Sequence, residues 1–485
     1  MVAKNEGVFS LRVQRFHVNS LEVVAVTIAK QILPEQEPFF LVALFEVFSI
    51  MSRLIEGEEA LMLDLKNLRK NPTTVENRLK TKNPELSLQP LLALDERIRT
   101  LKTSSEEWKS KKNLASKTLG EKKRKGEDIS SSTQEMTTLG EQIARADAEL
   151  AELENTLNQE LAVLPNLPMD DIPVSPSPKD NVCIKSWGVK REFDFPFKNH
   201  VELNERLKLF DFARGAKISG SGWPLYKGLG ARLEWALLNY MLDTHRKNGF
   251  MQIIPPLLVR PEIMFGSGQL PKFEHQLFKI RDEDYHLYLI PTSECSLNGM
   301  HSQEILEEEV LPLKYTAYSP CFRREAGAAG SQERGLIRTH QFNKVELFCF
   351  TQPEESARMF EAMVETATEV LEGLGLHYRN MLLTTGDMSF AAAKTVDIEV
   401  WLPGQNRYYE VSSVSNCTDF QARRSETKAR KSQDKPYYVH TLNGSGVATS
   451  RLMVALLENN QQADGSVLVP KVLQRYLEDE ISILN

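Results

Sequence analysis

Two long runs of apolar residues, spaced alternately three and four positions apart, constrain the fold of this chain more than any other feature. The first run begins at Leu91 and the second at Met136, and each has the seam pattern of a coiled coil. Between them, residues 120–133 are polar and contain a glycine and three consecutive serines. The sequence therefore predicts an antiparallel helical hairpin in residues 90–164. At the rise of an α-helix, its first helix would be about 50 Å long.

The charges on this hairpin are unevenly distributed. Residues 102–125 contain nine lysines and arginines but only three glutamates, whereas the second helix is more acidic. Because the whole chain has a net charge of −7, any contact with nucleic acid has to come from a local basic surface of this kind. The alternative is an ordinary solvated coiled coil whose charges form ion pairs between the helices.

The remainder of the chain divides into a short connection and a larger body. Residues 165–180 contain five prolines, which predicts an extended linker. In the body, residues 181–485, residues 228–248 have an amphipathic helical pattern and are followed by a short apolar strand. Further segments read as strands of an antiparallel sheet, which makes the body an α+β fold: 287–291, 316–322, 342–350, 395–402 and 408–414.

Cysteine spacing and hydropathy exclude several classes of protein. The five cysteines contain no Cys-x-x-Cys pair, so we expect free thiols in a reducing compartment and no structural zinc. The most apolar segment, residues 39–51, is too short to cross a membrane and contains a glutamate. The N-terminus lacks the pattern of a secretory signal. The sequence therefore predicts a cytoplasmic protein with no membrane partner.

Residues 320–346 carry the residues best suited to chemistry. Arg323 and Glu325 precede a Gly-rich loop, and Arg338, Phe342 and Glu346 follow it. Arginines match phosphate or carboxylate oxygens, an aromatic ring can stack on a purine, and a carboxylate can hold an ammonium group. Two strands flanking a loop would bring these side chains onto one surface. The alternative is a charged antiparallel hairpin with solvated ion pairs.

This segment resembles motif 2 of class II aminoacyl-tRNA synthetases, in the form found in bacterial seryl-tRNA synthetases. Residues 228–256 resemble motif 1, 292–294 the serine loop, 410–424 the metal and ATP strand, and 443–451 motif 3. Together with the helical hairpin, the resemblance covers about residues 62–485. It implies a class II antiparallel sheet flanked by helices, preceded by a tRNA-binding domain, residues 62–164, with a coiled-coil arm.

The resemblance also implies roles for individual residues, with Arg323 and Arg451 as the catalytic pair. It assigns ATP binding to Arg323, Arg324, Glu325, Arg338, Phe342, Glu410, Val411, Ser412, Ser413 and Arg451. It assigns serine binding to Thr292, Ser293, Glu294, Arg323, Glu346, Asn443 and Ser445. Glu410 and Ser413 would hold the Mg²⁺ that accompanies ATP. Because residues three apart on a regular strand face opposite sides, this last assignment requires a bulge or a twist.

The implied activity is that of a serine–tRNA ligase: activation of L-serine by ATP, then transfer to tRNA(Ser). The resemblance also implies a homodimer and permits serylation of tRNA(Sec). Two departures are a serine at position 450, where many class II enzymes have an acid, and Ser293, where alanine is commoner. Two alternatives are an inactive paralogue that only binds RNA or a partner, and a ligase that loads a carrier protein, a class that lacks the long arm.

Residues 1–61 do not take part in the resemblance. Met62 begins a sequence typical of the family start, which favours Met62 as the natural initiator. The alternative is a genuine N-terminal appendage, for which the apolar residues 39–55 could form a helix.

Overall fold

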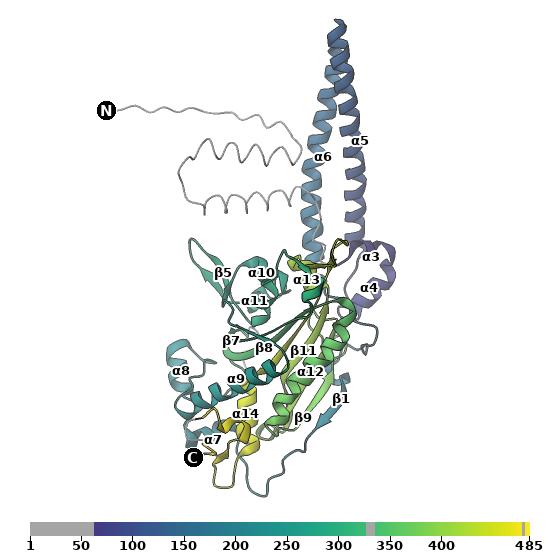
Figure 1. Ribbon diagram of the computed structural model, residues 1–485. Coiled ribbons are helices and arrows are strands. Elements are labelled where there is room, and N and C mark those ends of the chain that lie inside the picture. Colours follow the sequence, from purple (N-terminus) through teal and green to yellow (C-terminus); the bar gives the residue numbers. More distant parts are fainter. Residues whose placement is uncertain (1–62, 326–334, 478–480) are drawn as a thin grey trace, which may run out of the picture. The chain divides into compact units, whose positions relative to one another are not determined.

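The computed structural model describes residues 63–325, 335–477 and 481–485, so both alternatives for residues 1–61 lie outside the described residues. The N-terminal part is helical and includes the predicted hairpin (Figure 1). Its elements are α3 (Leu65–Lys70), α4 (Pro72–Lys80), α5 (Gln89–Lys125) and α6 (Ser130–Ala162). The reversal between α5 and α6 is shorter than the predicted 120–133. Gly126, in the left-handed region with φ 71°, ends α5, and residues 127–129 complete the turn.

Apolar packing and ion pairs hold the two helices of the hairpin together. Near its base, Leu91 and Ile98 of α5 are buried in one apolar cluster with Leu150 and Leu157 of α6. Ion pairs also join the two helices: Lys102 to Glu154 and Lys109 to Asp147, each at 2.8 Å. The predicted apolar seam is therefore present, and so are the interhelical ion pairs of the alternative interpretation, an ordinary solvated coiled coil.

The proline-rich segment 165–180 is packed on the following body. The backbone N–H of Asn166 donates to the carbonyl of Phe390 at 2.9 Å, and its side-chain amide donates to the carbonyl of Cys417 at 2.7 Å. Ile172 is buried in an apolar cluster with Met381 and other residues of the body. The predicted extended linker is therefore packed against the body along its path, and it ends in a short 3-10 helix, Pro178–Asp180.

An eight-stranded sheet forms the centre of the body, in the order β1-β9-β10-β11-β14-β8-β7-β2. It is antiparallel except where β2 pairs with β7. The strands are β1 (Val182–Trp187), β2 (Met251–Ile253), β7 (Leu313–Phe322), β8 (Gln341–Thr351), β9 (Tyr378–Leu382), β10 (Lys394–Leu402), β11 (Arg407–Thr418) and β14 (His440–Ala448).

Four of the five predicted strand segments lie in this sheet, and the fifth does not. Segment 287–291 corresponds to β5 (His286–Leu289), which pairs with β3 (Leu258–Val259) and β4 (Lys279–Arg281) in a separate three-stranded sheet. Its apolar pattern predicted a strand but could not specify which strands it would pair with, because pairing depends on residues distant in sequence.

Three helices cover one face of the large sheet: α9 (Leu229–Lys247), α12 (Ser356–Gly373) and α14 (Thr449–Asn460) (Figure 1). The largest apolar cluster lies between these helices and the sheet and includes Leu233, Met363 and Leu456. The helix predicted at 228–248 is α9, which begins after Gly228. On the opposite face, α11 (Ser293–Gly299) and α13 (Phe420–Ser425) pack on part of β8 and β14, where Phe348 and Phe350 are buried.

Shorter elements complete the body. They are α7 (His200–Leu207), α8 (Phe212–Ser219), α10 (Pro261–Gly266), α11 (Ser293–Gly299), α13 (Phe420–Ser425), α15 (Lys471–Gln474), β6 (Ile305–Glu307), β12 (Lys428–Arg430), β13 (Tyr437–Tyr438), β15 (Val467–Leu468) and β16 (Ile483–Leu484). Among the described residues, no helix is both long enough and apolar enough to span a bilayer.

Candidate active site

The alternation of side chains along β8 separates the core from the candidate site. Val345 and Leu347 belong to the apolar cluster under the helices, so Phe342, Lys344 and Glu346 lie on the other face. Glu346 is paired with Ser445 of β14 in the strand register. The sheet thus brings together two residues predicted to bind serine that are 99 positions apart in the sequence.

The charged residues of 320–346 lie around the end of the β7–β8 pair. Arg323 is exposed; its Nε donates to the carbonyl of Pro291 at 3.3 Å, and its guanidinium lies 5.2 Å from the centre of the Phe342 ring. Arg338 Nη1 and Glu325 Oε2 form an ion pair at 2.7 Å. Arg324 is exposed beside them. Two arginines, an aromatic ring and a carboxylate therefore share one surface, as the sequence predicted.

The loop that contains Gly222 and Trp223 packs against His340, which is bonded to the backbone of Arg323. His340 packs on Trp223, with ring centres 5.5 Å apart, and its Nδ1 is 3.1 Å from the Arg323 carbonyl. Gly222 has φ 81° and lies against His340, so a Cβ at this position would come within 2.8 Å of the imidazole. Glycine at 222 is therefore required both by the backbone conformation and by the close packing.

The predicted serine pocket contains a lysine that sequence reasoning missed. Lys344 is buried; its ammonium donates to Thr292 Oγ1 at 2.7 Å and forms an ion pair with Glu346. The hydroxyl of Thr292 is also 3.2 Å from Glu346 Oε2. Ser293 bonds the buried hydroxyl of Ser319 at 2.6 Å, and Ser319 is paired with Lys344 in the β7–β8 register. The alternation of β8 could have identified Lys344, which shares a face with Phe342 and Glu346.

Glu294 lies beside this pair in an acidic environment. Burial raises the pKa of its carboxyl to about 7, and the negative charge of Glu346 contributes to the increase. The side-chain amide of Gln421, on α13, donates to Glu294 Oε1 at 2.6 Å and is itself fully buried. Gln421 also accepts a hydrogen bond from Thr441 at 2.7 Å. It was missed because nothing in the sequence relates α13 to the serine loop.

A bulge in β11 brings Glu410 and Ser413 to the site face. Opposite the consecutive residues Ile398 and Glu399 of β10, the register of β11 advances from Ser412 to Glu410 and leaves Val411 as the extra residue. Val411 and Val414 are both in the core cluster, so Glu410 and Ser413 lie on the opposite face. The irregularity that the predicted metal assignment required is therefore present.

The side chains of the other predicted residues of β11 and β14 do not all face the candidate site. The side chain of Val411 is in the core, and the hydroxyl of Ser412 donates to the carbonyl of Ser445, so only their backbones can contact a ligand. Asn443 is half-buried, and its amide donates to Cys417 Sγ at 3.3 Å. Arg451 of α14 donates to the carbonyl of Glu410 at 2.7 Å, which joins motif 3 to the bulged strand.

The donors around the bulge suit a hard cation that arrives with its ligand. Asp397 of β10 is paired with Ser413 in the register, its side chain accepts a hydrogen bond from Ser413, and its Oδ1 has no partner among the described residues. Burial and the charge of Glu410 raise the Asp397 pKa. No group of three or more acidic, histidine or cysteine side chains among the described residues forms a complete metal site. Phosphate oxygens would have to supply the remaining ligands.

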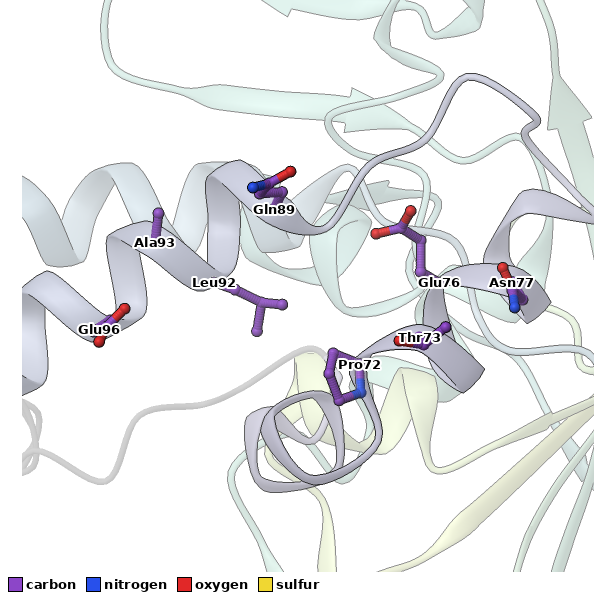
Figure 2. Close-up of a pocket in the computed structure, with 8 residues that line it drawn as sticks. All are labelled: Pro72, Thr73, Glu76, Asn77, Gln89, Leu92, Ala93 and Glu96. Carbon is purple, nitrogen blue, oxygen red and sulfur yellow. The ribbon is translucent and has the colours of Figure 1, made fainter.

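A cavity of about 350 Å³ lies outside this site, between α4 and the first turns of α5 (Figure 2). Glu76 lines it, accepts a hydrogen bond from the backbone N–H of Leu88 at 3.0 Å and forms an ion pair with Lys80. These contacts fix the α4–α5 connection. None of the predicted site residues lines this cavity.

Comparisons with known proteins agree along most of the chain. The family "Seryl-tRNA synthetase N-terminal domain" matches residues 62–168, and the family "tRNA synthetase class II core domain (G, H, P, S and T)" matches residues 275–460. Serine–tRNA ligase of Chlamydia abortus is 53% identical over 87% of this chain and 100% of its own length. That of Chlamydia felis is 54% identical over 86% of this chain and 98% of its own length.

Solved structures give the same result. Seryl-tRNA synthetase from Pyrococcus horikoshii, complexed with ATP, has a TM-score of 0.82 and 38% identity, covering 87% of this chain and 99% of that one. A cytoplasmic serine–tRNA ligase from Naegleria fowleri, in complex with AMP, has a TM-score of 0.77 and 30% identity, covering 86% of this chain and 96% of that one.

Proposed function

This chain belongs to the seryl-tRNA synthetase family, and from that membership we propose that it is a serine–tRNA ligase. It activates L-serine with ATP and transfers the seryl group to tRNA(Ser). The observation that carries this proposal is the convergence of motif 2, the serine loop, the bulged strand and motif 3 on one face of a class II sheet. That combination argues against an inactive paralogue, because a protein that only bound RNA would not need the converged charges.

In the first half of the reaction, the serine carboxylate attacks the α-phosphorus of ATP. A new oxygen–phosphorus bond forms, the bond to the leaving pyrophosphate breaks, and seryl-adenylate remains. We assign Arg323 to bridge the serine carboxylate and the α-phosphate, and Phe342 to stack on adenine. A fixed donor aimed at developing charge contributes about 3–4 kcal/mol in a closed site. No protein nucleophile is required.

The remaining ATP contacts follow the arrangement of the charged groups. Arg451 and Arg338 bind the β- and γ-phosphates, Glu325 lies at the adenine end, and Arg324 adds positive charge beside it. Mg²⁺, when bound with ATP, screens the phosphate charge. Glu410 and Ser413 are the side chains that hold it, which their shared face on β11 supports.

Serine recognition uses the acidic pocket beside Arg323. Glu346 and the Thr292–Glu294 loop bind the ammonium group, while Asn443 and Ser445 bind the hydroxyl. A pocket built to hydrogen-bond a hydroxyl rejects alanine, because its own polar groups would be left unpaired. Threonine is excluded by size.

The arm formed by α5 and α6 provides the contact with tRNA. Its outer part exposes basic side chains that can meet phosphates, and shape rather than base sequence would be recognised. These are Lys111, Lys117, Lys123, Arg124 and Lys125. tRNA(Ser) is the proposed substrate, and tRNA(Sec) is a second candidate with the same acceptor requirement.

Two further proposals concern the state of the enzyme. The cytoplasm suits a chain whose five cysteines are all free thiols. A homodimer is supported by the sheet edge at β2, where Met251 and Ile254 are 62% and 87% exposed, and by Trp235 of α9, which is 55% exposed. Large apolar side chains at an unpaired sheet edge are suited to burial against a second copy.

Amino-acid-dependent exchange of pyrophosphate into ATP, measured with each of the twenty amino acids, tests the proposed activation step. Exchange with serine alone is expected. Arg323→Ala should abolish it without unfolding the protein, whereas Arg358→Ala, which removes an exposed arginine on α12, should leave it unchanged. Absence of exchange with every amino acid, from folded protein, would favour the inactive paralogue. Normal exchange in Arg323→Ala would show that the site is misplaced.

A further inference from the structure

Glu234 is a buried acid on the inner side of α9, where its neighbours are apolar. Only 4% of its surface is exposed, and the adjacent Leu233 and Leu237 are fully buried. None of the chemistry proposed above uses this carboxyl. A buried acid is costly unless hydrogen bonds satisfy it, so its contacts require an explanation.

Those contacts reach the two segments that carry the ATP-binding residues. Glu234 Oε1 accepts a hydrogen bond from the Asn343 amide at 2.9 Å and is also bonded to the hydroxyl of Thr449. Asn343 lies on β8 directly between Phe342 and Lys344 and faces the helices. Thr449 begins α14, two residues before Arg451. One carboxyl on α9 therefore holds both segments from behind the sheet.

We propose that Glu234 is a positioning residue. From the helix-covered face of the sheet it fixes Phe342 and Arg451 relative to each other, and these two residues line the proposed ATP pocket on the opposite face. The inference rests on the proposed function, since it takes these two residues as ATP contacts. Glu234 itself touches no substrate.

The hydrogen-bond inventory indicates that Glu234 acts in its neutral form. The Thr449 hydroxyl has one proton but lies within bonding distance of both Glu234 and the carbonyl of Asn343, the latter at 3.0 Å. Pro320, which is opposite Asn343 in the β7–β8 register, has no N–H to offer that carbonyl. The Thr449 proton is therefore shared between Glu234 Oε1 and that carbonyl, which compensates a neutral carboxyl better than a carboxylate.

Two further observations agree with a neutral carboxyl. Glu234 Oε2 has no hydrogen-bond partner among the described residues, which is far less costly for an uncharged acid than for a carboxylate. Burial raises the pKa of Glu234, although the bonds from Thr449 and Asn343 act in the opposite direction. Glu234, Thr449 and Asn343 therefore form one connected hydrogen-bond network between α9, β8 and α14.

Two variants of Glu234 test whether its hydrogen bonds or its charge support ATP binding. Glu234→Gln keeps an oxygen at the position of Oε1, where it can accept the hydrogen bonds from Asn343 and Thr449, and should retain ATP affinity. Glu234→Leu removes both attachments and should weaken ATP binding by about tenfold, the effect of losing a buried hydrogen bond, while the KM for serine changes little. ATP binding is measured by calorimetry with a non-hydrolysable ATP analogue, and the two KM values by pyrophosphate exchange.

Leu238→Ala is the matched control, because it creates a defect one turn from Glu234 in the same buried face of α9 and removes no side-chain hydrogen bond. It should lower the melting temperature but leave the ratio of the two KM values unchanged. Folded Glu234→Leu with wild-type ATP affinity would overturn the inference, as would equal losses for ATP and serine, or a Glu234→Gln variant as impaired as Glu234→Leu. If the wild type binds the analogue but exchanges with no amino acid, the calorimetry still tests Glu234 while the proposed function fails.

Discussion

At the scale of single residues, the serine pocket contains two carboxylates, Glu294 and Glu346, and one ammonium group, that of Lys344. The pKa of Glu294 is raised to about 7, and the ionisable groups around it are Glu346, Lys344, Arg323 and the buried thiols of Cys295 and Cys417. In the proposed pocket the ionised carboxylate binds the serine ammonium group, so binding would require loss of the proton. The KM for serine should therefore rise as the pH falls below about 7, approaching tenfold per pH unit.

Pyrophosphate exchange between about pH 6 and 8 measures this effect, with the KM for ATP followed in parallel. Glu294→Gln should bind serine more weakly and lose the pH dependence. A KM for serine that is flat in the wild type, or equally steep in Glu294→Gln, would contradict the role given to Glu294.

The sequence predicted the positions of residues inside the motifs, but it did not identify the residues that hydrogen-bond to them. Arg323, Glu325, Arg338 and Phe342 were predicted to share a surface, and they do. Gln421 and Glu234 were missed. Gln421 lies 127 positions from the carboxylate it contacts, and Glu234 lies in the helix that resembles motif 1, to which the sequence assigned no site residue. Their roles depend on contacts between segments distant in sequence, which no local pattern encodes.

At the scale of elements, the pairing of α5 with α6 shows where the arm can be shortened without changing the catalytic body. Lys109 and Asp147 face each other at 2.8 Å, so replacing residues 110–146 with a short Gly-Ser turn keeps the base of the hairpin, where Leu91, Ile98, Leu150 and Leu157 pack. Serine activation should be unchanged, because no site residue is removed. Aminoacylation of tRNA should fall by roughly two orders of magnitude with the loss of several phosphate contacts.

Initial rates of pyrophosphate exchange and of tRNA charging, measured on the same preparation, give the two results. A control that replaces Glu135 and Glu141 of α6 with glutamine leaves the exposed lysines intact and should retain charging. Normal charging by the shortened enzyme would remove the arm from tRNA recognition.

Elements were predicted with unequal success, for identifiable reasons. The hairpin helices follow from periodicity alone, but their turn was predicted too long, because the polar residues 120–125 continue the helix up to Gly126. The bulge at Val411 was required by the spacing of Glu410 and Ser413 and is present. β5 was recognised as a strand but assigned to the wrong sheet, since a short apolar strand can pair with any edge of matching length.

At the scale of the whole molecule, the proposed dimer surface and the proposed ATP site share a structural element. Ile254 follows the edge strand β2 and is 87% exposed, and Trp235 of α9 is 55% exposed. Trp235 also packs on Tyr318, with ring centres 5.5 Å apart, and the Tyr318 hydroxyl lies 3.4 Å from the Asn343 side-chain oxygen. A partner covering this surface would therefore support, from outside, the same asparagine that Glu234 holds from within.

Ile254→Asp tests this connection, because a charge at the centre of an apolar interface is strongly unfavourable. The wild type should sediment as a dimer and Ile254→Asp as a monomer at micromolar concentration, with a raised KM for ATP in the monomer. Val189→Asp, which changes an apolar residue that is 89% exposed in the segment between β1 and α7, should remain dimeric and fully active. A monomeric Ile254→Asp with unchanged KM for ATP would separate assembly from the ATP site, and a wild type that sediments as a monomer would exclude the proposed dimer.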